Sequence, residues 1–119
     1  MAIDALQRPG VSVPRAVLDA LVRTFDPIKV ILFGSHARGE AGPDSDLDLM
    51  VVVDDAMPAE RRTVRAAFEA VAGTGIAVDV VPVRAGTFDY KRDVVNSLAW
   101  FAATEGVVVY ERGGQREGA

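Results

Sequence analysis

The sequence predicts a small α/β fold, and two observations indicate it. Runs rich in β-branched and apolar residues predict strands at Lys29–Phe33, Asp46–Val53, Ile76–Val83 and Val107–Tyr110. Segments with apolar residues at helical spacing predict helices at Pro14–Phe25, Pro58–Ala72 and Asp93–Thr104. Strands that alternate with helices are typical of a sheet covered by helices on at least one face.

The helices are predicted from their end signals and apolar faces. Pro14 suits the first turn of the first helix, and Pro27 suits its end. Residues 58–72 are rich in good helix formers, and their apolar members are expected to form one stripe opposite an arginine face. The stripe consists of Val64, Ala67, Phe68 and Val71, and the arginines are Arg61, Arg62 and Arg65. Trp100 and Phe101 are expected in the core, unless one stays exposed for a partner.

Length and composition narrow the class of protein. The chain has 119 residues, half of them apolar, which fits a single domain over residues 1–112 with a flexible tail at 113–119. A net charge of −4 argues against direct binding of nucleic acid. The absence of cysteine excludes disulfides and thiol chemistry, and the apolar runs are too short to span a membrane. With no secretory signal visible, we expect a cytoplasmic protein.

The stretch GSHARGEAGPDSDLDLM at residues 34–50 carries the candidate site. Gly34 and Gly39 have the glycine spacing of a phosphate-binding P-loop, but Glu40 and Ala41 stand where that loop needs a lysine and a hydroxyl. A calcium loop beginning at Asp44 fails as well, because its sixth residue is Leu49 rather than glycine. Asp44 itself is expected to be a turn residue.

Strand geometry favours a third interpretation. Residues two apart in a strand point the same way, so Asp46 and Asp48 share a face, about 6.6 Å apart along the chain. Like charges this close favour a cation between them, and oxygen ligands suit Mg²⁺ or Mn²⁺. Asp79 interrupts the apolar run of a later strand, where a charge is costly unless it is paired or bound to metal. If that strand lies beside the second one, Asp79 can reach the same ion.

The glycine-serine turn before these aspartates is expected to hold a phosphate. Gly34 ends a strand and allows close approach of the backbone, and the turn offers N–H groups and the Ser35 hydroxyl to an anion. Ser35 could equally serve as a helix N-cap. Arg38 could reach a phosphate, or brace Glu40 or Asp44. An acidic metal site facing a phosphate cradle is what metal-assisted transfer of a nucleotidyl group requires.

The spacing Gly34-Ser35, ten residues, Asp46-x-Asp48, with Asp79 on a later strand, resembles the signature of nucleotidyltransferases with the DNA polymerase beta-like fold. The short chain and the ending EGVVVYE resemble its minimal nucleotidyltransferase (MNT) branch. The resemblance implies a small mixed β-sheet with helices packed on it, Gly34 and Ser35 on the triphosphate, and two Mg²⁺ ions on Asp46 and Asp48. Asp79 would complete the site and help to activate the acceptor.

The resemblance also implies a substrate and a partner. Members of this branch are commonly antitoxins that transfer AMP from ATP to a HEPN-domain ribonuclease toxin encoded beside them. Two alternatives remain open: an antitoxin that neutralises its partner by binding alone, and a transferase that modifies a small molecule such as an antibiotic. The assembly, a homodimer or a hetero-oligomer with the toxin, is also left open.

Overall fold

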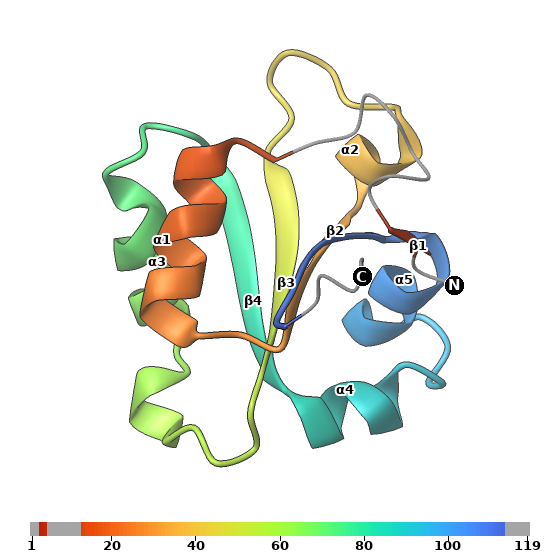
Figure 1. Cartoon of the computed structure of the whole chain (residues 1–119). Coiled ribbons are helices and arrows are strands. Elements are labelled where there is room, and N and C mark those ends of the chain that lie inside the picture. The colour runs from red at the N-terminus through yellow and green to blue at the C-terminus, as the bar shows by residue number, and fades with distance from the viewer. Residues whose placement is uncertain (1–2, 5–12, 114–119) are drawn as a thin grey trace.

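A mixed five-stranded sheet forms the centre of the part of the chain that the structure describes (Figure 1). The structure is a computed structural model, and it describes residues 3–4 and 13–113. The strands lie in the order β1-β5-β2-β3-β4. Their bounds are β1 Ile3–Asp4, β2 Lys29–Phe33, β3 Leu47–Val53, β4 Val78–Arg84 and β5 Val107–Glu111. The helices are α1 Arg15–Phe25, α2 Ser35–Arg38, η2 Ala59–Arg61, α3 Val64–Ala72, α4 Ala85–Lys91 and α5 Leu98–Glu105.

The strand directions bring several chain segments to one edge of the sheet. Strand β2 runs antiparallel to both of its neighbours, β3 and β5, and β4 runs parallel to β3. The end of β2 therefore lies beside the starts of β3, β4 and β5. The residues that follow β2 and those that precede the other three strands meet at this edge, which we call the site edge.

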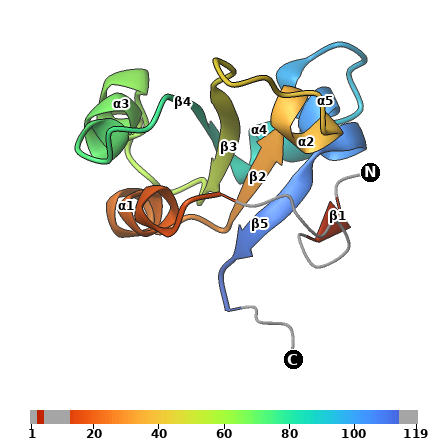
Figure 2. The same ribbon diagram turned by 90° about the horizontal axis from the view of Figure 1, so that it is seen from above.

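Helices cover both faces of the sheet, which confirms the predicted architecture (Figure 2). On one face α1 and α3 pack against the alternating residues Leu47, Leu49, Val51 and Val53 of β3. On the other face, α4 and α5 pack against Met50 and Val52. The same alternation places Asp48 on the face of α4 and α5, because residues two apart in a strand point the same way.

Several predicted elements are confirmed with small changes in their bounds. Helix α1 follows Pro14, as predicted, and ends at Asp26, which has a φ of 43°. The predicted turn after β2 is the short helix α2. Strand β3 begins at Leu47, one residue later than predicted, so that Asp46 lies directly before the strand. Strand β1 was not predicted from the sequence.

The predicted helix at 93–104 is wrong in its first half. The structure has α4 at Ala85–Lys91, then turns, then α5 from Leu98 onward. Asn96 adopts a φ of 73°, which interrupts a helix. Ser97 then caps the new helix, since its side chain accepts a hydrogen bond from the Trp100 N–H.

The single apolar stripe predicted on the helix at 58–72 is also wrong. Thr63 caps α3 by accepting a hydrogen bond from the Ala66 N–H, and the preceding residues form the separate turn η2. The buried face of α3 is made of Ala67 and Val71, with Ala66 and Ala70 partly buried beside them. Val64 and Phe68 are instead 72% and 67% exposed.

The core beneath α5 is built from small side chains. Ala99, Ala102 and Ala103 are the buried residues of this helix, while Trp100 and Phe101 are only half-buried and meet edge to face at 5.0 Å. The prediction that both aromatic residues lie in the core is therefore not confirmed. In the described part of the chain no helix is long and apolar enough to cross a membrane. Residues 114–119 of the predicted tail lie outside the described residues.

Candidate active site

Two of the three predicted aspartates are neighbours across adjacent strands. Asp48 of β3 and Asp79 of β4 are register partners in a parallel pair. Neighbouring strands lie about 4.8 Å apart, and register partners point to the same face. Asp79 lies on an edge strand and is exposed. Its charge is therefore not buried, and the expected cost of an unpaired charge in a buried strand does not arise. Its predicted position beside Asp48 is nevertheless confirmed.

The third aspartate joins them from the residue before β3. Asp46 is exposed, and its negative charge acts on Asp48. The pKa of Asp48 is raised by burial first, then by the charges of Asp79 and Asp46. His36 and Arg38 act in the opposite direction and lower it. The site edge thus gathers three carboxylates that repel one another, with two basic side chains within electrostatic reach.

Gly34 presses directly against this cluster. It follows β2 and has a φ of 77° and a ψ of −156°, a conformation that essentially only glycine adopts. A Cβ at this position would collide with the Asp48 carboxylate. Glycine at this position therefore allows the Asp48 carboxylate to lie directly against the backbone of the turn.

The turn after Gly34 is a single helical turn rather than a loop. Gly34 is the N-cap residue of α2, and Ser35 is its first helical residue, so the alternative that Ser35 caps the helix is wrong. The Arg38 N–H donates to the Gly34 carbonyl at 3.1 Å, and Gly39 ends the helix with a φ of 76°. Ser35 is half-buried at the start of this turn, next to the glycine that contacts Asp48.

Arg38 is held by two carboxylates. Its Nε donates to Glu40 Oε1 at 2.8 Å, which is one of the alternatives predicted from the sequence. Its Nη1 donates to Glu105 Oε1 at 2.7 Å, and this partner was not predicted. Glu105 is the last residue of α5 and lies 67 positions further along the chain. It reaches the site because β5, which follows it, starts at the site edge.

The carboxylates suit a divalent metal ion whose coordination is completed by a bound ligand. Within residues 3–4 and 13–113, no three His, Asp or Glu side chains form a ready-made metal cage. Mg²⁺ is commonly bound by one or two carboxylates together with waters and substrate phosphates. Asp48 and Asp79 in register, with the raised pKa of Asp48, make a donor set of this open kind. The residues present therefore suit magnesium or manganese together with a phosphate.

The sequence belongs to the nucleotidyltransferase domain family. The family's model matches residues 14–101, which is 88 of the 119 residues. The matched segment contains the glycine-serine turn and all three aspartates of the site edge, but it ends before Glu105. Among curated proteins, none matches the chain closely enough to count as a relative.

Two solved structures resemble the fold. One is a chain of a toxin-antitoxin complex with AMP-PNP, with a TM-score of 0.52, 21% identity, and coverage of 88% of this chain and 79% of that chain. The other is a candidate nucleotidyltransferase from Sulfolobus solfataricus, with a TM-score of 0.44, 20% identity, and coverage of 87% of this chain and 94% of that chain. The first supports the small mixed sheet with helices packed on it that the sequence predicted.

Proposed function

We propose that this protein is a metal-dependent nucleotidyltransferase that transfers AMP from ATP to a hydroxyl group of a partner protein. The observation that carries the proposal is the arrangement of Asp48 and Asp79 in register with Gly34 packed on the Asp48 carboxylate. Membership of the nucleotidyltransferase domain family supports the reaction class. ATP and two Mg²⁺ ions, for which Mn²⁺ can substitute, are the proposed substrate and cofactors.

In the proposed reaction the acceptor oxygen attacks the α-phosphorus, the bond to the β-phosphate oxygen breaks, and pyrophosphate leaves. Bound metal would neutralise the phosphates and lower the pKa of the acceptor hydroxyl. Asp46, Asp48 and Asp79 would bind the metal, and Asp79 would also help to remove the proton of the acceptor hydroxyl. Gly34 and Ser35 would hold the triphosphate, and Arg38 would contact one of its phosphates.

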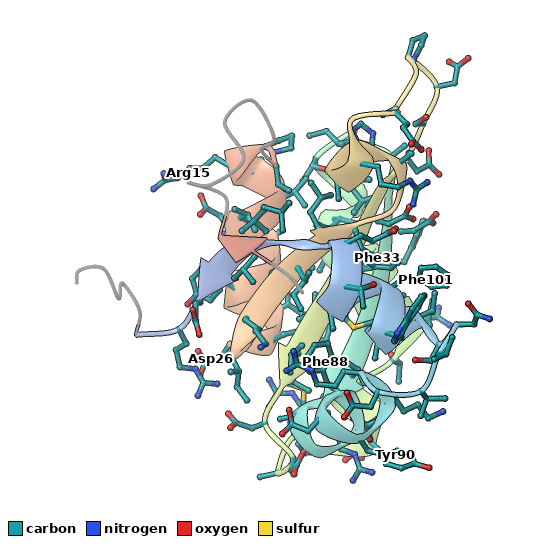
Figure 3. The ribbon with its side chains drawn as sticks, turned by 90° about the vertical axis from the view of Figure 1, so that its right-hand side faces the viewer. Arg15, Asp26, Phe33, Phe88, Tyr90 and Phe101 are labelled. Carbon is teal, nitrogen blue, oxygen red and sulfur yellow. The ribbon has the colours of Figure 1, made fainter. Side chains whose placement is uncertain are left out.

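We propose a HEPN-family toxin as the partner, which makes this protein an MNT antitoxin. The fold likeness to a chain of a toxin-antitoxin complex with AMP-PNP supports this assignment. Exposed apolar side chains at the α4–α5 connection also favour a protein partner, since a surface of this kind is typical of interaction sites. They are Tyr90, Val94, Val95 and Leu98, and Tyr90 lies at the end of the molecule away from α2 (Figure 3).

Intact-mass spectrometry tests the proposal. The protein is mixed with the product of its neighbouring gene, ATP and Mg²⁺, and both masses are recorded. An AMP-sized gain on the partner is expected with the wild type and absent with the double variant Asp46→Asn, Asp48→Asn. The matched control is Asp44→Asn, because Asp44 is exposed and lies only two residues before the site.

The same mixtures separate the two alternatives. If the double variant still neutralises the toxin without any mass gain, the protein acts by binding alone and the catalytic proposal is wrong. If neither protein chain gains mass, but a hydroxyl-bearing small molecule added to the mixture gains the mass of AMP, the acceptor is a small molecule.

A further inference from the structure

We propose that Glu105 is a positioning residue that holds Arg38 in place for the phosphates of the nucleotide. The inference rests on the proposed function, because it assigns a role at the same site. Glu105 lies outside the segment that the family's model matches.

The contacts restrain the guanidinium from two sides. Glu105 accepts from Nη1 at 2.7 Å and Glu40 accepts from Nε at 2.8 Å. Arginine carries five N–H donors in a fixed plane, so these two bonds define the orientation of the group and leave Nη2 for another acceptor. The Arg38 and Glu105 side chains are 40% and 30% exposed, which leaves the pair accessible to a ligand. A planar donor group with fixed orientation suits a phosphate.

The placement of Glu105 is not explained by the stability of α5. It is the last residue of that helix, where the helix dipole disfavours a negative charge, and the last turn has no basic residue of its own. The compensating cation is Arg38 of α2, which follows β2, the strand that pairs with β5. The Glu105 carboxylate is thus unfavourable for the stability of its own helix and favourable for the position of Arg38.

Gly106 fixes the backbone next to Glu105. It is buried, and a Cβ there would collide with the Ala102 carbonyl and the Ile31 side chain of β2. The Gly106 N–H also donates to the Ala102 carbonyl at 3.0 Å. The end of α5 is therefore pressed against the centre of the sheet, and the carboxylate that grips Arg38 is supported by a rigid element.

The restraint also protects the metal site. Arg38 is within electrostatic reach of Asp48, on which its positive charge acts. An unrestrained guanidinium beside three aspartates would pair with them and compete with a metal ion. By binding Arg38, the two glutamates keep the aspartate carboxylates available for cations. Loss of Glu105 is therefore expected to weaken binding of both the metal and the nucleotide.

The test uses Glu105→Gln, which keeps the shape and removes the charge. Binding of a non-hydrolysable ATP analogue with Mg²⁺ is expected to weaken about 3- to 10-fold, with KM for ATP rising more than kcat falls. Glu105→Asp keeps the charge but not the reach, and is expected to bind the analogue as weakly as Glu105→Gln. The matched control is Glu69→Gln, because Glu69 pairs with Arg65 at 3.2 Å on α3, outside the site.

A double variant distinguishes positioning from a structural role. Arg38→Ala alone is expected to weaken analogue binding about 10- to 100-fold. If Glu105 acts through Arg38, adding Glu105→Gln to Arg38→Ala changes binding less than about twofold, since coupled residues are not additive. An equal effect of Glu105→Gln in both backgrounds would overturn the inference.

Three further outcomes have defined meanings. Tighter analogue binding by Glu105→Gln would also overturn the inference, because Glu105 would then withhold Arg38 from the phosphates. A wild type that binds the analogue without transferring AMP contradicts the proposed function, while the binding comparison still tests Glu105. A wild type that does not bind the analogue overturns both.

Discussion

Replacement of Gly34 by alanine tests the geometry at the centre of the site. The φ of 77° and ψ of −156° lie in a region that costs a non-glycine residue about 1–3 kcal/mol. The new Cβ would also collide with the Asp48 carboxylate and force that side chain away from its preferred rotamer, at a cost of about 0.5–1.5 kcal/mol. Together, the loss in free energy of unfolding is about 2–4 kcal/mol.

The matched control is Gly39→Ala. Gly39 has nearly the same φ, 76°, but a Cβ there would have no atom within 4 Å. Its loss is therefore expected to be about 1–2 kcal/mol, from the backbone conformation alone. The ψ angles differ, −156° at Gly34 and 19° at Gly39, so the larger loss expected at Gly34 combines its costlier backbone region with the contact to Asp48.

Chemical denaturation and transferase activity provide the two measurements. A domain stability of about 5–15 kcal/mol leaves both variants folded at 25 °C. Activity of Gly34→Ala is expected to fall at least about 100-fold, because displacing a metal-binding carboxylate by an ångström has effects of this size. Gly39→Ala should remain within a few-fold of the wild type. Equal stability losses and equal activities in the two variants would refute the reasoning.

Two further predictions concern the carboxylates at the two ends of the sheet. Because burial and then Asp79 raise the pKa of Asp48 above its unfolded value, ionised Asp48 destabilises the fold above its folded pKa, and this penalty is lost as the pH falls toward 3.8. In metal-free buffer at pH 7, Asp48→Asn should therefore raise the free energy of unfolding by about 0.5 kcal/mol. This gain should vanish below pH 3.8. Added Mg²⁺ should raise the Tm of the wild type and not that of the variant. At the far end, Arg112 donates to Asp54 and to the Asp26 carbonyl, both at 2.7 Å, so Arg112→Ala should lower the free energy of unfolding by about 1 kcal/mol and leave activity unchanged. A loss of activity in Arg112→Ala would contradict the placement of the active site at the site edge, because Arg112 lies at the far end of the sheet.

The placement of the candidate site residues could be predicted from the sequence because its signals are local. Alternation in β3 determines which face Asp48 points to, and this alternation can be read from the apolar residues that follow it. The glycine-serine turn directly follows an apolar strand, so its place at a strand end was also readable. The position of Asp79 beside Asp48 required only that the two strands be neighbours, which their pairing confirms.

The sequence was misleading where the structure depends on a single cap or a distant contact. Asn96 and Ser97 divide a segment that composition alone predicts as one helix. Thr63 starts α3 after the separate turn η2, so the predicted single helix is divided there, and Phe68 is exposed. Both effects come from backbone conformation at one or two residues. Periodicity averages over many residues, so it does not detect them.

Glu105 illustrates a different reason for failure. Its link to Arg38 spans 67 positions and exists because β5 is antiparallel to β2, which brings the end of α5 to the place where α2 begins. Glu105 begins the ending EGVVVYE that resembles the MNT branch, but that pattern does not indicate its contact with Arg38. A second signal is its unfavourable charge at a helix C-terminus.

The site as a whole is arranged against the stability of the free protein. Three carboxylates repel one another, Gly34 holds a conformation that other residues avoid, and Glu105 opposes its helix dipole. On the proposed function, bound metal would neutralise the three carboxylates, and a phosphate would accept from the guanidinium that Glu105 holds, so that ligand would offset the repulsion in the free protein. Ligand binding should therefore stabilise the wild type more than any variant that relieves one of these features, and this difference separates a working nucleotide site from a surface that is merely acidic.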